Sequence, residues 1–247
     1  MITLKTTEHL TGVEISGSFE DLNMLYDALT NLTGDDMSYS GYYQSSLHVL
    51  ALCYDIRHAY QGDREKAKSP YGEEHYSFKW YWPDLLFVYA VLEDFIDISC
   101  GPQCYLRRED AEKRFFNPET KDMLLDRLPD DIALTNYFRE LIRNELGRVI
   151  DEKKFRSIFR KIDSGYYNKQ DFINYRTQMI SILTVKYAKR APEKRRTYLA
   201  TIAEKIFFGN DDYDIIANAV NRFATEEGVD PSDIVLEGME YPEKQEW

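Results

Sequence analysis

Alternation of apolar and polar residues, which is typical of strands with one buried face, occurs in only two stretches of this 247-residue chain, both within its first 82 residues. Residues 2–17 carry Ile2 and Leu4, and then Val13 and Ile15, each pair separated by one polar residue. Residues 76–82 form an aromatic, alternating stretch. The rest of the chain is patterned with helical spacing. We therefore predict an α+β protein: a small antiparallel sheet packed by helices, followed by a mostly helical C-terminal section.

Helix signals follow the first strands. Ser18 stands at an N-cap position with acidic residues in the next turn, and Gly34 supplies a stop. A second helix over residues 42–60 is expected to bury an apolar stripe, which consists of Tyr43, Leu47, Leu50, Ala51 and Tyr54. Residues 64–74 read as a loop, and Pro83 fits the first turn of a third helix.

From residue 106 onward the spacing is helical almost throughout. One helix is expected to start at Pro118, and further helices are expected over residues 130–149, 152–162, 169–189, 192–208 and 211–225. Ile234–Leu236 reads as a short late strand. Because the character of the chain changes near residue 102, we divide it into an α+β N-terminal section, residues 1–104, and a helical section, residues 105–247. One fused domain is the alternative.

The net charge of −12 is unevenly distributed along the chain. Residues 1–104 carry −10, residues 105–224 carry +5, and residues 225–247 carry −7. An acidic balance disfavours nucleic acid and anionic lipid as partners, because both are polyanions, although the basic middle section keeps nucleic acid open there. We expect the acidic residues 225–247 to fold over the basic helices.

The composition points to the cytoplasm. Three cysteines cannot form a fully paired disulfide framework, and the first residues lack an apolar segment behind a basic one. The longest apolar stretch, residues 85–98, is interrupted by three acids and is too short to span a bilayer. We expect a cytoplasmic protein that does not associate with membranes.

Asp55, Arg57 and His58 are the candidate catalytic residues. Asp55 and His58 lie three residues apart on the predicted helix, where a carboxylate can orient an imidazole, and Arg57 can hold an anion beside them. No nucleophile or metal completes the set, however, and His58 continues the apolar stripe of its helix. A structural histidine near the core is the favoured interpretation.

No metal or cofactor is predicted. Cys100 and Cys104 lack the second pair of ligands that a zinc site requires. Residues 159–172 are similar to the second half of a calcium-binding loop. The first and third ligand positions would then be Arg160 and Ile162, which cannot bind a hard cation.

Six basic residues gather where two predicted helices meet at residues 191–192. They are Lys186, Lys189, Arg190, Lys194, Arg195 and Arg196. We interpret them as a solvated helix junction. An acidic surface, of this chain or of a partner, is the second candidate to bind there, and the phosphates of a nucleic acid are the third.

The chain has 19 tyrosines, and several lie in or near the predicted loops and strand of the first section. The candidate partner-binding residues are Tyr39, Tyr42, Tyr43, Tyr71, Tyr76 and Tyr81. Tyrosine suits the core of an interface because it brings a large contact area at a small entropic cost. Aromatic filling of the space between sheet and helices is the equal alternative.

Residues 6–17, 53–64 and 76–87, the last with its Trp82-Pro83 pair, carry a family resemblance. They are similar to an uncharacterised bacterial family, a domain of unknown function. The resemblance covers roughly the first 100 residues and implies a bacterial cytoplasmic protein. It carries over no activity and no catalytic residues.

These features favour a non-catalytic, cytoplasmic protein-binding module whose acidic, Tyr-rich N-terminal surface docks another protein. The alternative is a hydrolase or nuclease that acts on a phosphate-containing substrate through Asp55, Arg57 and His58. A homo-oligomer with the tyrosines at its self-interface is the third hypothesis.

Overall fold

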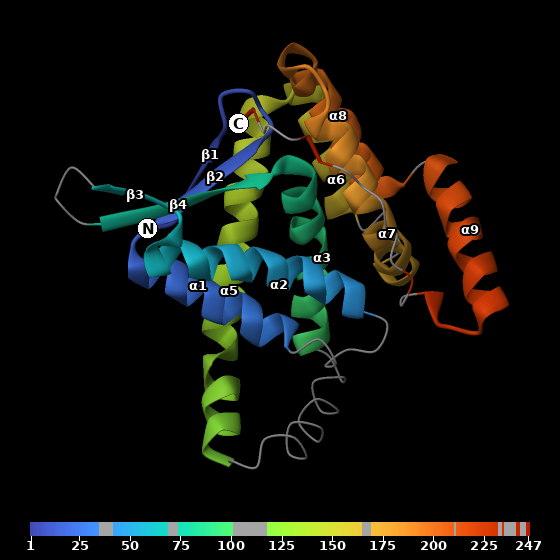
Figure 1. Ribbon diagram of the computed structural model, residues 1–247. Coiled ribbons are helices and arrows are strands. Elements are labelled where there is room, and N and C mark those ends of the chain that lie inside the picture. Colours follow the sequence, from blue (N-terminus) through green and yellow to red (C-terminus); the bar gives the residue numbers. More distant parts are fainter. Residues whose placement is uncertain are drawn as a thin grey trace.

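The fold was established from a computed structural model of the chain (Figure 1). It describes residues 1–34, 42–68, 74–100, 118–164, 169–209, 211–231, 234, 241–242 and 246–247.

The predicted antiparallel sheet is confirmed and has four strands in the order β1-β2-β4-β3. The strands are β1 (Thr3–Thr6), β2 (Gly12–Gly17), β3 (Glu65–Lys68) and β4 (Glu74–Tyr81). Val13 lies opposite Trp80 and Ile15 opposite Phe78, so the apolar residues of both strands share one face. β3 occupies part of the segment that was expected to be a loop. All four of its residues are exposed, so it has no apolar alternation for a sequence pattern to detect.

Helix α1 (Phe19–Thr33) begins and ends where the sequence predicted. The Ser18 hydroxyl accepts from the backbone N–H of Asp21 at 3.2 Å, and the Asp21 carboxylate accepts from the backbone N–H of Ser18 at 3.0 Å. This reciprocal pair is a capping box. Gly34 follows the helix with a φ of 72°, a conformation that glycine adopts without strain.

Helix α2 (Tyr43–His58) buries a different face from the one predicted. Leu47, Ala51 and Tyr54 are exposed, whereas the buried residues are Ser45, Ser46, Val49, Leu52, Cys53 and Ile56. Two serines occupy the first turn of the buried face because each has a partner there. The Ser45 hydroxyl bonds that of Thr177 at 2.9 Å, and the Ser46 hydroxyl donates to the Tyr43 carbonyl at 2.7 Å. A prediction from the spacing of apolar residues alone therefore identifies the wrong face of α2 as buried.

Helix α3 (Trp82–Cys100) is the central element, and most of its residues are buried. It contacts β4 and α1 on the N-terminal side, and α5, α7 and α8 on the C-terminal side. Figure 1 shows α1 and α2 side by side, with α3 and α5 passing behind them. Among the described residues, no helix is both long enough and apolar enough to cross a membrane.

Helix α5 (Pro118–Val149) runs without a break through Pro129, although two separate helices were expected. An interior proline removes one backbone hydrogen bond and costs roughly 3 kcal/mol in an isolated helix. Here both sides of the proline are bound to α1. Arg127 pairs with Asp27 at 3.7 Å, and the Asn31 amide donates to Asp131 at 3.0 Å. These tertiary contacts and those of the packed helix faces favour the continuous helix.

The remaining predicted helices are confirmed to within two residues. They are α6 (Glu152–Asp163), α7 (Lys169–Ala188), α8 (Pro192–Phe208) and α9 (Asp211–Glu227). Of the predicted late strand, residues 235 and 236 lie outside the described residues, and Ile234 is not in a strand.

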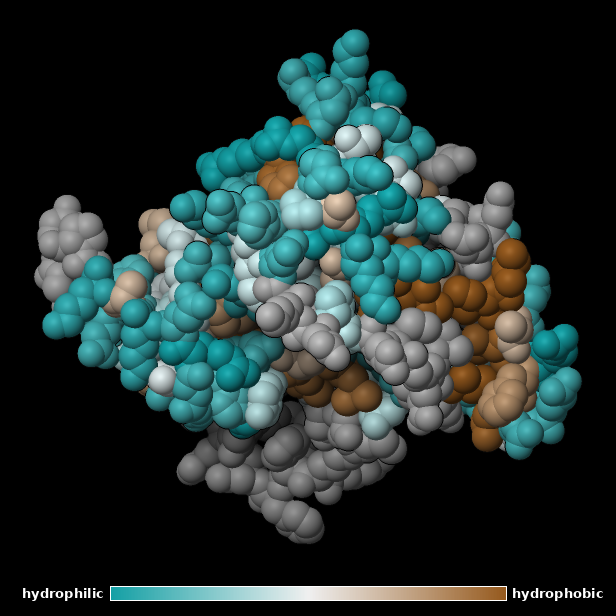
Figure 2. All heavy atoms as spheres, turned by 45° about the horizontal axis from the view of Figure 1, so that its top comes forward, coloured by the Kyte–Doolittle hydropathy of each residue, from teal (hydrophilic) through white to brown (hydrophobic). Residues whose placement is uncertain are grey.

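One connected cluster of buried side chains extends from Ile2 to Phe207. It includes Phe138 of α5 and Leu199 of α8 together with the buried face of the sheet, so residues of the N-terminal and helical sections share a core. The view in Figure 2 is largely hydrophilic, with apolar surface on the side where α9 lies. Two exposed apolar residues of α9 are Ile215 and Phe223.

Candidate functional site

The candidate catalytic residues at the end of α2 do not pair as expected. The Asp55 carboxylate accepts from Arg64 Nη2 at 2.6 Å, and His58 Nδ1 lies 2.9 Å from Asp63 Oδ2. Asp63 is the last residue of a π-helical turn, η1 (Ala59–Asp63), in which Gly62 has a φ of 90°, and Arg64 follows it directly. This turn reverses the chain over the end of α2, and a glycine at this φ is what allows it.

His58 is half-buried, since its side chain is 24% exposed. The Tyr54 ring covers it with 4.2 Å between ring centroids, and Arg57 Cζ lies 5.5 Å from the centroid of the same Tyr54 ring. Arg57 and His58 therefore flank an exposed tyrosine. The arrangement offers a hydrogen-bonded imidazole, and the structure places no nucleophile beside it among the contacts described.

A second group of aromatic side chains joins the π-turn to α1. The Tyr60 ring meets the rings of Phe19 and Tyr26 edge-on, with centroids 5.2 and 6.1 Å apart. Burial raises the pKa of Tyr60, the charge of Asp27 acts in the same direction, and the charge of Arg57 acts in the opposite one. We call this set the aromatic row, and its members are Phe19, Tyr26, Tyr54, Arg57, His58 and Tyr60.

The aromatic row is partly exposed, and the elements that carry it also carry acidic residues. Phe19 and Tyr54 are 46% and 52% exposed, and Met24 of α1 is 55% exposed. The carboxylates carried by the same two helices and the π-turn are those of Glu20, Asp21, Asp27, Asp55 and Asp63. Large aromatic side chains held in place by ring contacts, with arginine among them, are the residue types that dominate protein–protein interfaces.

Of the six tyrosines predicted from the sequence to bind a partner, the four that the structure describes are not members of the aromatic row. Tyr39 and Tyr71 lie outside the described residues. Tyr42 packs on the core, its ring centroid 6.0 Å from that of Phe95, and Tyr43 is half-buried at the start of α2.

Tyr76 and Tyr81 lie near opposite ends of β4. The Tyr76 hydroxyl donates to the carboxylate of Glu74 at 2.8 Å. Tyr81 lies beneath the end of the chain, with its ring centroid 5.5 Å from that of Tyr241 and 4.9 Å from that of Trp247. Burial, with the charge of Asp84, raises the pKa of Tyr81 to about 12.

Arg195 is not part of a solvated helix junction, because it is 2% exposed. Its Nη1 donates to the His9 carbonyl at 2.9 Å and to the Thr11 hydroxyl at 2.6 Å, and its Nη2 donates to the Ala188 carbonyl at 2.9 Å. A signal for this burial exists in the sequence. Arg195 falls on the stripe that continues with Leu199, Ile202 and Ile206, all of which are buried.

The other five basic residues of that group lie at the surface. Arg190 places its Cζ 3.6 Å from the centroid of the Tyr198 ring, a cation–π contact. The remaining exposed members are Lys186, Lys189, Lys194 and Arg196. Only part of the predicted anion-binding group is therefore available to a ligand.

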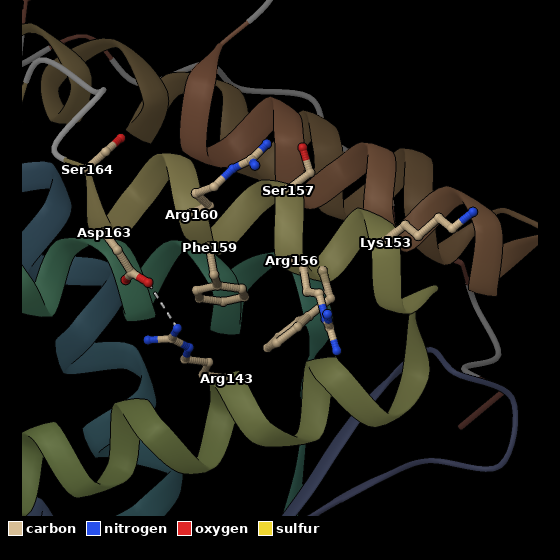
Figure 3. Close-up of a pocket in the computed structure, with 9 residues that line it drawn as sticks. Arg143, Lys153, Arg156, Ser157, Phe159, Arg160, Asp163 and Ser164 are labelled. Atoms are coloured by element: carbon tan, nitrogen blue, oxygen red, sulfur yellow. Dashed lines mark hydrogen bonds and ion pairs between the residues drawn. The ribbon is translucent and has the colours of Figure 1, made fainter.

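A separate basic depression of about 790 Å³ lies along α6 and was not predicted (Figure 3). Its lining residues are Arg143, Lys153, Phe155, Arg156, Ser157, Phe159, Arg160, Asp163 and Ser164. At one end, Arg143 Nη2 bonds Asp163 at 3.2 Å, as Figure 3 shows. Arg156 is paired with Glu152. Among the described residues no ion pair engages Lys153 or Arg160.

Asp84, in the first turn of α3, is a perturbed carboxyl group that the sequence did not single out. Burial raises its pKa to about 7, while a hydrogen bond from the Thr184 hydroxyl at 2.8 Å acts in the opposite direction. Perturbed carboxyls occur both in functional sites and in structural networks.

Within the described residues no three histidine, cysteine or acidic side chains are arranged to hold a metal ion. Cys100 is exposed, and Cys104 lies outside the described residues.

Comparison with known proteins places the chain in a family without assigning it an activity. No curated protein and no solved structure matches it. One family model, a domain of unknown function named DUF6904, matches residues 2–247. This match spans the helical section as well as the first 100 residues, to which the resemblance noted in the sequence had been limited. The chain belongs to the DUF6904 family.

Proposed function

We propose that the protein is a non-catalytic binding protein whose acidic, aromatic α1–α2 surface docks another protein. The observation that carries this proposal is the aromatic row, in which Phe19 and Tyr54 are about half exposed while ring contacts hold their neighbours in place. Side chains that are already ordered lose less conformational freedom on binding than free ones.

The charge of the N-terminal section indicates the chemistry of the partner. Residues 1–104 carry −10, and the elements that carry the aromatic row also carry acidic residues. A basic surface with apolar pockets would complement it, and opposite charge would accelerate its association. We place the interaction in the bacterial cytoplasm, on the family resemblance and on the free thiols of Cys53 and Cys100.

The experiment is a pull-down from native bacterial cytoplasm at low and raised salt. The wild-type chain is compared with a Phe19→Ser/Tyr54→Ser variant and with Tyr137→Ser as the matched control, since Tyr137 is an exposed tyrosine on α5. We expect a salt-sensitive partner that the double variant retains at least tenfold less well and the control retains unchanged. A partner captured equally by all three chains, or none, contradicts the proposal. Capture of a second copy alone would instead support the homo-oligomer.

A second candidate function, the binding of a phosphate-bearing ligand, is favoured by the basic depression along α6. Lys153 and Arg160 offer cationic donors, and Ser157 offers a hydroxyl from the same lining. Phosphate oxygens accept such charge-assisted hydrogen bonds strongly. Asp55, Arg57 and His58 do not line this depression, so the hydrolase hypothesis would need its catalytic residues elsewhere.

Titration with inorganic pyrophosphate, followed by calorimetry or by NMR, tests this second function. Lys153→Ala/Arg160→Ala is expected to weaken binding at least tenfold. Lys186→Ala/Lys189→Ala, which removes two exposed lysines from α7 and the residues after it, is expected to leave binding unchanged. Equal weakening by both pairs would show a nonspecific effect of charge.

A further inference from the structure

The end of the chain is seated against the sheet in a defined site. We call residues 241–247 the tail, of which 241–242 and 246–247 are described. Figure 1 places this end of the chain beside the turn that joins β1 and β2. The Tyr81 ring, at the end of β4, contacts the rings of both Tyr241 and Trp247, and we call these two tail residues the aromatic clamp.

The Trp247 ring packs against the backbone of a glycine, Gly12, which we call the glycine floor. A Cβ at Gly12 would lie 2.9 Å from the Trp247 ring and 2.0 Å from the Trp80 carbonyl oxygen. Any other residue at position 12 would collide with both the strand and the indole. The site therefore holds an aromatic ring against bare backbone.

Hydrogen bonds fix the residue before the tryptophan. The Thr11 hydroxyl donates to the Glu246 carbonyl, and Arg195 Nη1 donates to the same oxygen at 3.3 Å. Arg195 Nε is buried and finds no partner among the described residues. One backbone carbonyl is thus recognised by a hydroxyl and by a buried guanidinium.

Arg195 also has acceptors outside the tail. The carbonyl of His9 accepts from its Nη1 and that of Ala188 from its Nη2. The Tyr187 hydroxyl likewise anchors the β1–β2 turn by donating to the Leu10 carbonyl at 2.6 Å. Arg195 and the β1–β2 turn, which border the site, therefore also make contacts outside the tail.

We propose that Thr11, Gly12, Tyr81 and Arg195 form a peptide-recognition site for a partner segment that presents an aromatic side chain next to a free backbone carbonyl, and that the tail occupies this site in cis. The proposal does not rest on the α1–α2 surface. A tethered occupant acts at an effective concentration on the order of millimolar, so an external segment competes only when the tail is weakened or the segment binds more tightly.

The test uses the full chain and a labelled synthetic peptide with the sequence of residues 241–247. Trp247→Ala removes the larger ring of the clamp, and we expect it to bind the peptide at least tenfold more tightly than the wild-type chain does. Adding Thr11→Val to the Trp247→Ala chain removes a hydrogen-bond donor at nearly constant volume. We expect this double variant to bind the peptide at least fivefold more weakly than Trp247→Ala does. A peptide with alanine in place of its tryptophan is the matched control and is expected to bind at least tenfold more weakly.

Failure of the peptide to bind Trp247→Ala, with circular dichroism and cooperative melting like those of the wild type, would overturn the proposal. Equal binding to wild type and variant would overturn it as well, because the tail would then not occupy the site. Should Trp247→Ala misfold, Trp247→Leu keeps an apolar contact on the glycine floor and takes its place in the same comparison.

Discussion

The environment of several polar side chains in this protein is set by the tertiary contacts that bury them and not by their neighbours in sequence. Arg195 lies between two other cations in the chain, yet only Arg195 is buried, with carbonyl and hydroxyl oxygens as its acceptors. His48 lies on a helix with its ring centroid 5.1 Å from that of Phe87. Asp84 faces Thr184 from the first turn of α3. For the two titratable groups, burial makes stability depend on pH.

His48 is expected to lower stability in acid. Burial lowers its pKa from 6.5 to about 4, so between these values the unfolded chain binds a proton that the folded chain does not. The free energy of unfolding therefore falls as the pH drops from about 6.5 to about 4. Denaturant melts at several pH values should show a shallower loss over this window in His48→Gln. The same slope in both chains would contradict the assignment.

Asp84 is expected to act in the opposite sense. Its pKa is raised from 3.8 to about 7, so the folded chain keeps a proton that the unfolded chain has released. Stability then falls as the pH rises from about 4 to about 7, by at most about 1.4 kcal/mol per pH unit from this one group. Asp84→Asn keeps the shape without the charge. The free energy of unfolding of this variant, relative to that of the wild type, should increase as the pH rises toward 7. A difference between the two chains that stays constant from about pH 4 to about pH 7 would argue against a buried titrating carboxyl.

At the scale of elements, local signals located the ends of helices better than their faces. Ser18, Gly34 and Pro192 mark boundaries through their own backbone chemistry, and the helices begin and end there. The exposed edge strand β3 and the unbroken course of α5 through Pro129 depend on neighbouring elements, and both differed from prediction. The buried face of α2 differed because serines take places that an apolar pattern assigns to leucines.

The capping box of α1 supports a prediction at this scale. Ser18→Ala leaves the backbone N–H of Asp21 without its acceptor and is expected to lower the free energy of unfolding by about 1 kcal/mol. Thr201→Ala, an exposed substitution within α8, is the control and should change stability by less than about 0.5 kcal/mol. Urea melts of the three chains provide the comparison. Equal effects would show that the cap contributes nothing specific.

At the scale of the whole molecule, the two sections of the sequence are joined through α3. It contacts strands β2 and β4, and it also contacts the helices α5, α7 and α8. Glu145 of α5 adds a polar connection, because its carboxylate accepts from the backbone N–H of Thr6 on strand β1 at 2.8 Å. The division at residue 104 is therefore bridged by both apolar and polar contacts, and we expect the sections to unfold together.

Phe138→Ala tests that expectation. Phe138 of α5 is fully buried, and its loss is expected to cost about 3–5 kcal/mol. Trp80 and Trp82 belong to the N-terminal section, so tryptophan fluorescence mainly reports on that section while far-UV circular dichroism reports on all helices. Both signals should shift to the same lower midpoint. A fluorescence transition that stays in place while the circular dichroism shifts would show two independent domains.

The candidate sites divide in the same way as the fold. The acidity of the first section and its wealth of aromatic residues were visible in the sequence, and so was the cluster around His58. The partners were not, because the π-turn at Gly62 assigns Asp63 to His58 and Arg64 to Asp55. The tail site joins the β1–β2 turn, β4, α8 and the end of the chain, segments up to about 235 residues apart. A local sequence pattern cannot predict contacts between segments so far apart in the chain.

The sequence by itself determined the α+β class, the antiparallel pairing of the first strands and the limits of most helices, because periodicity and capping are properties of a few neighbouring residues. Only the tertiary structure decided which of three adjacent cations is buried, which face of α2 meets the core, that α5 continues through its proline, and where the tail is seated. These outcomes are free-energy differences between alternative packings, in which distant residues supply the acceptor, the ring or the helix face, and a local pattern contains no information about those partners.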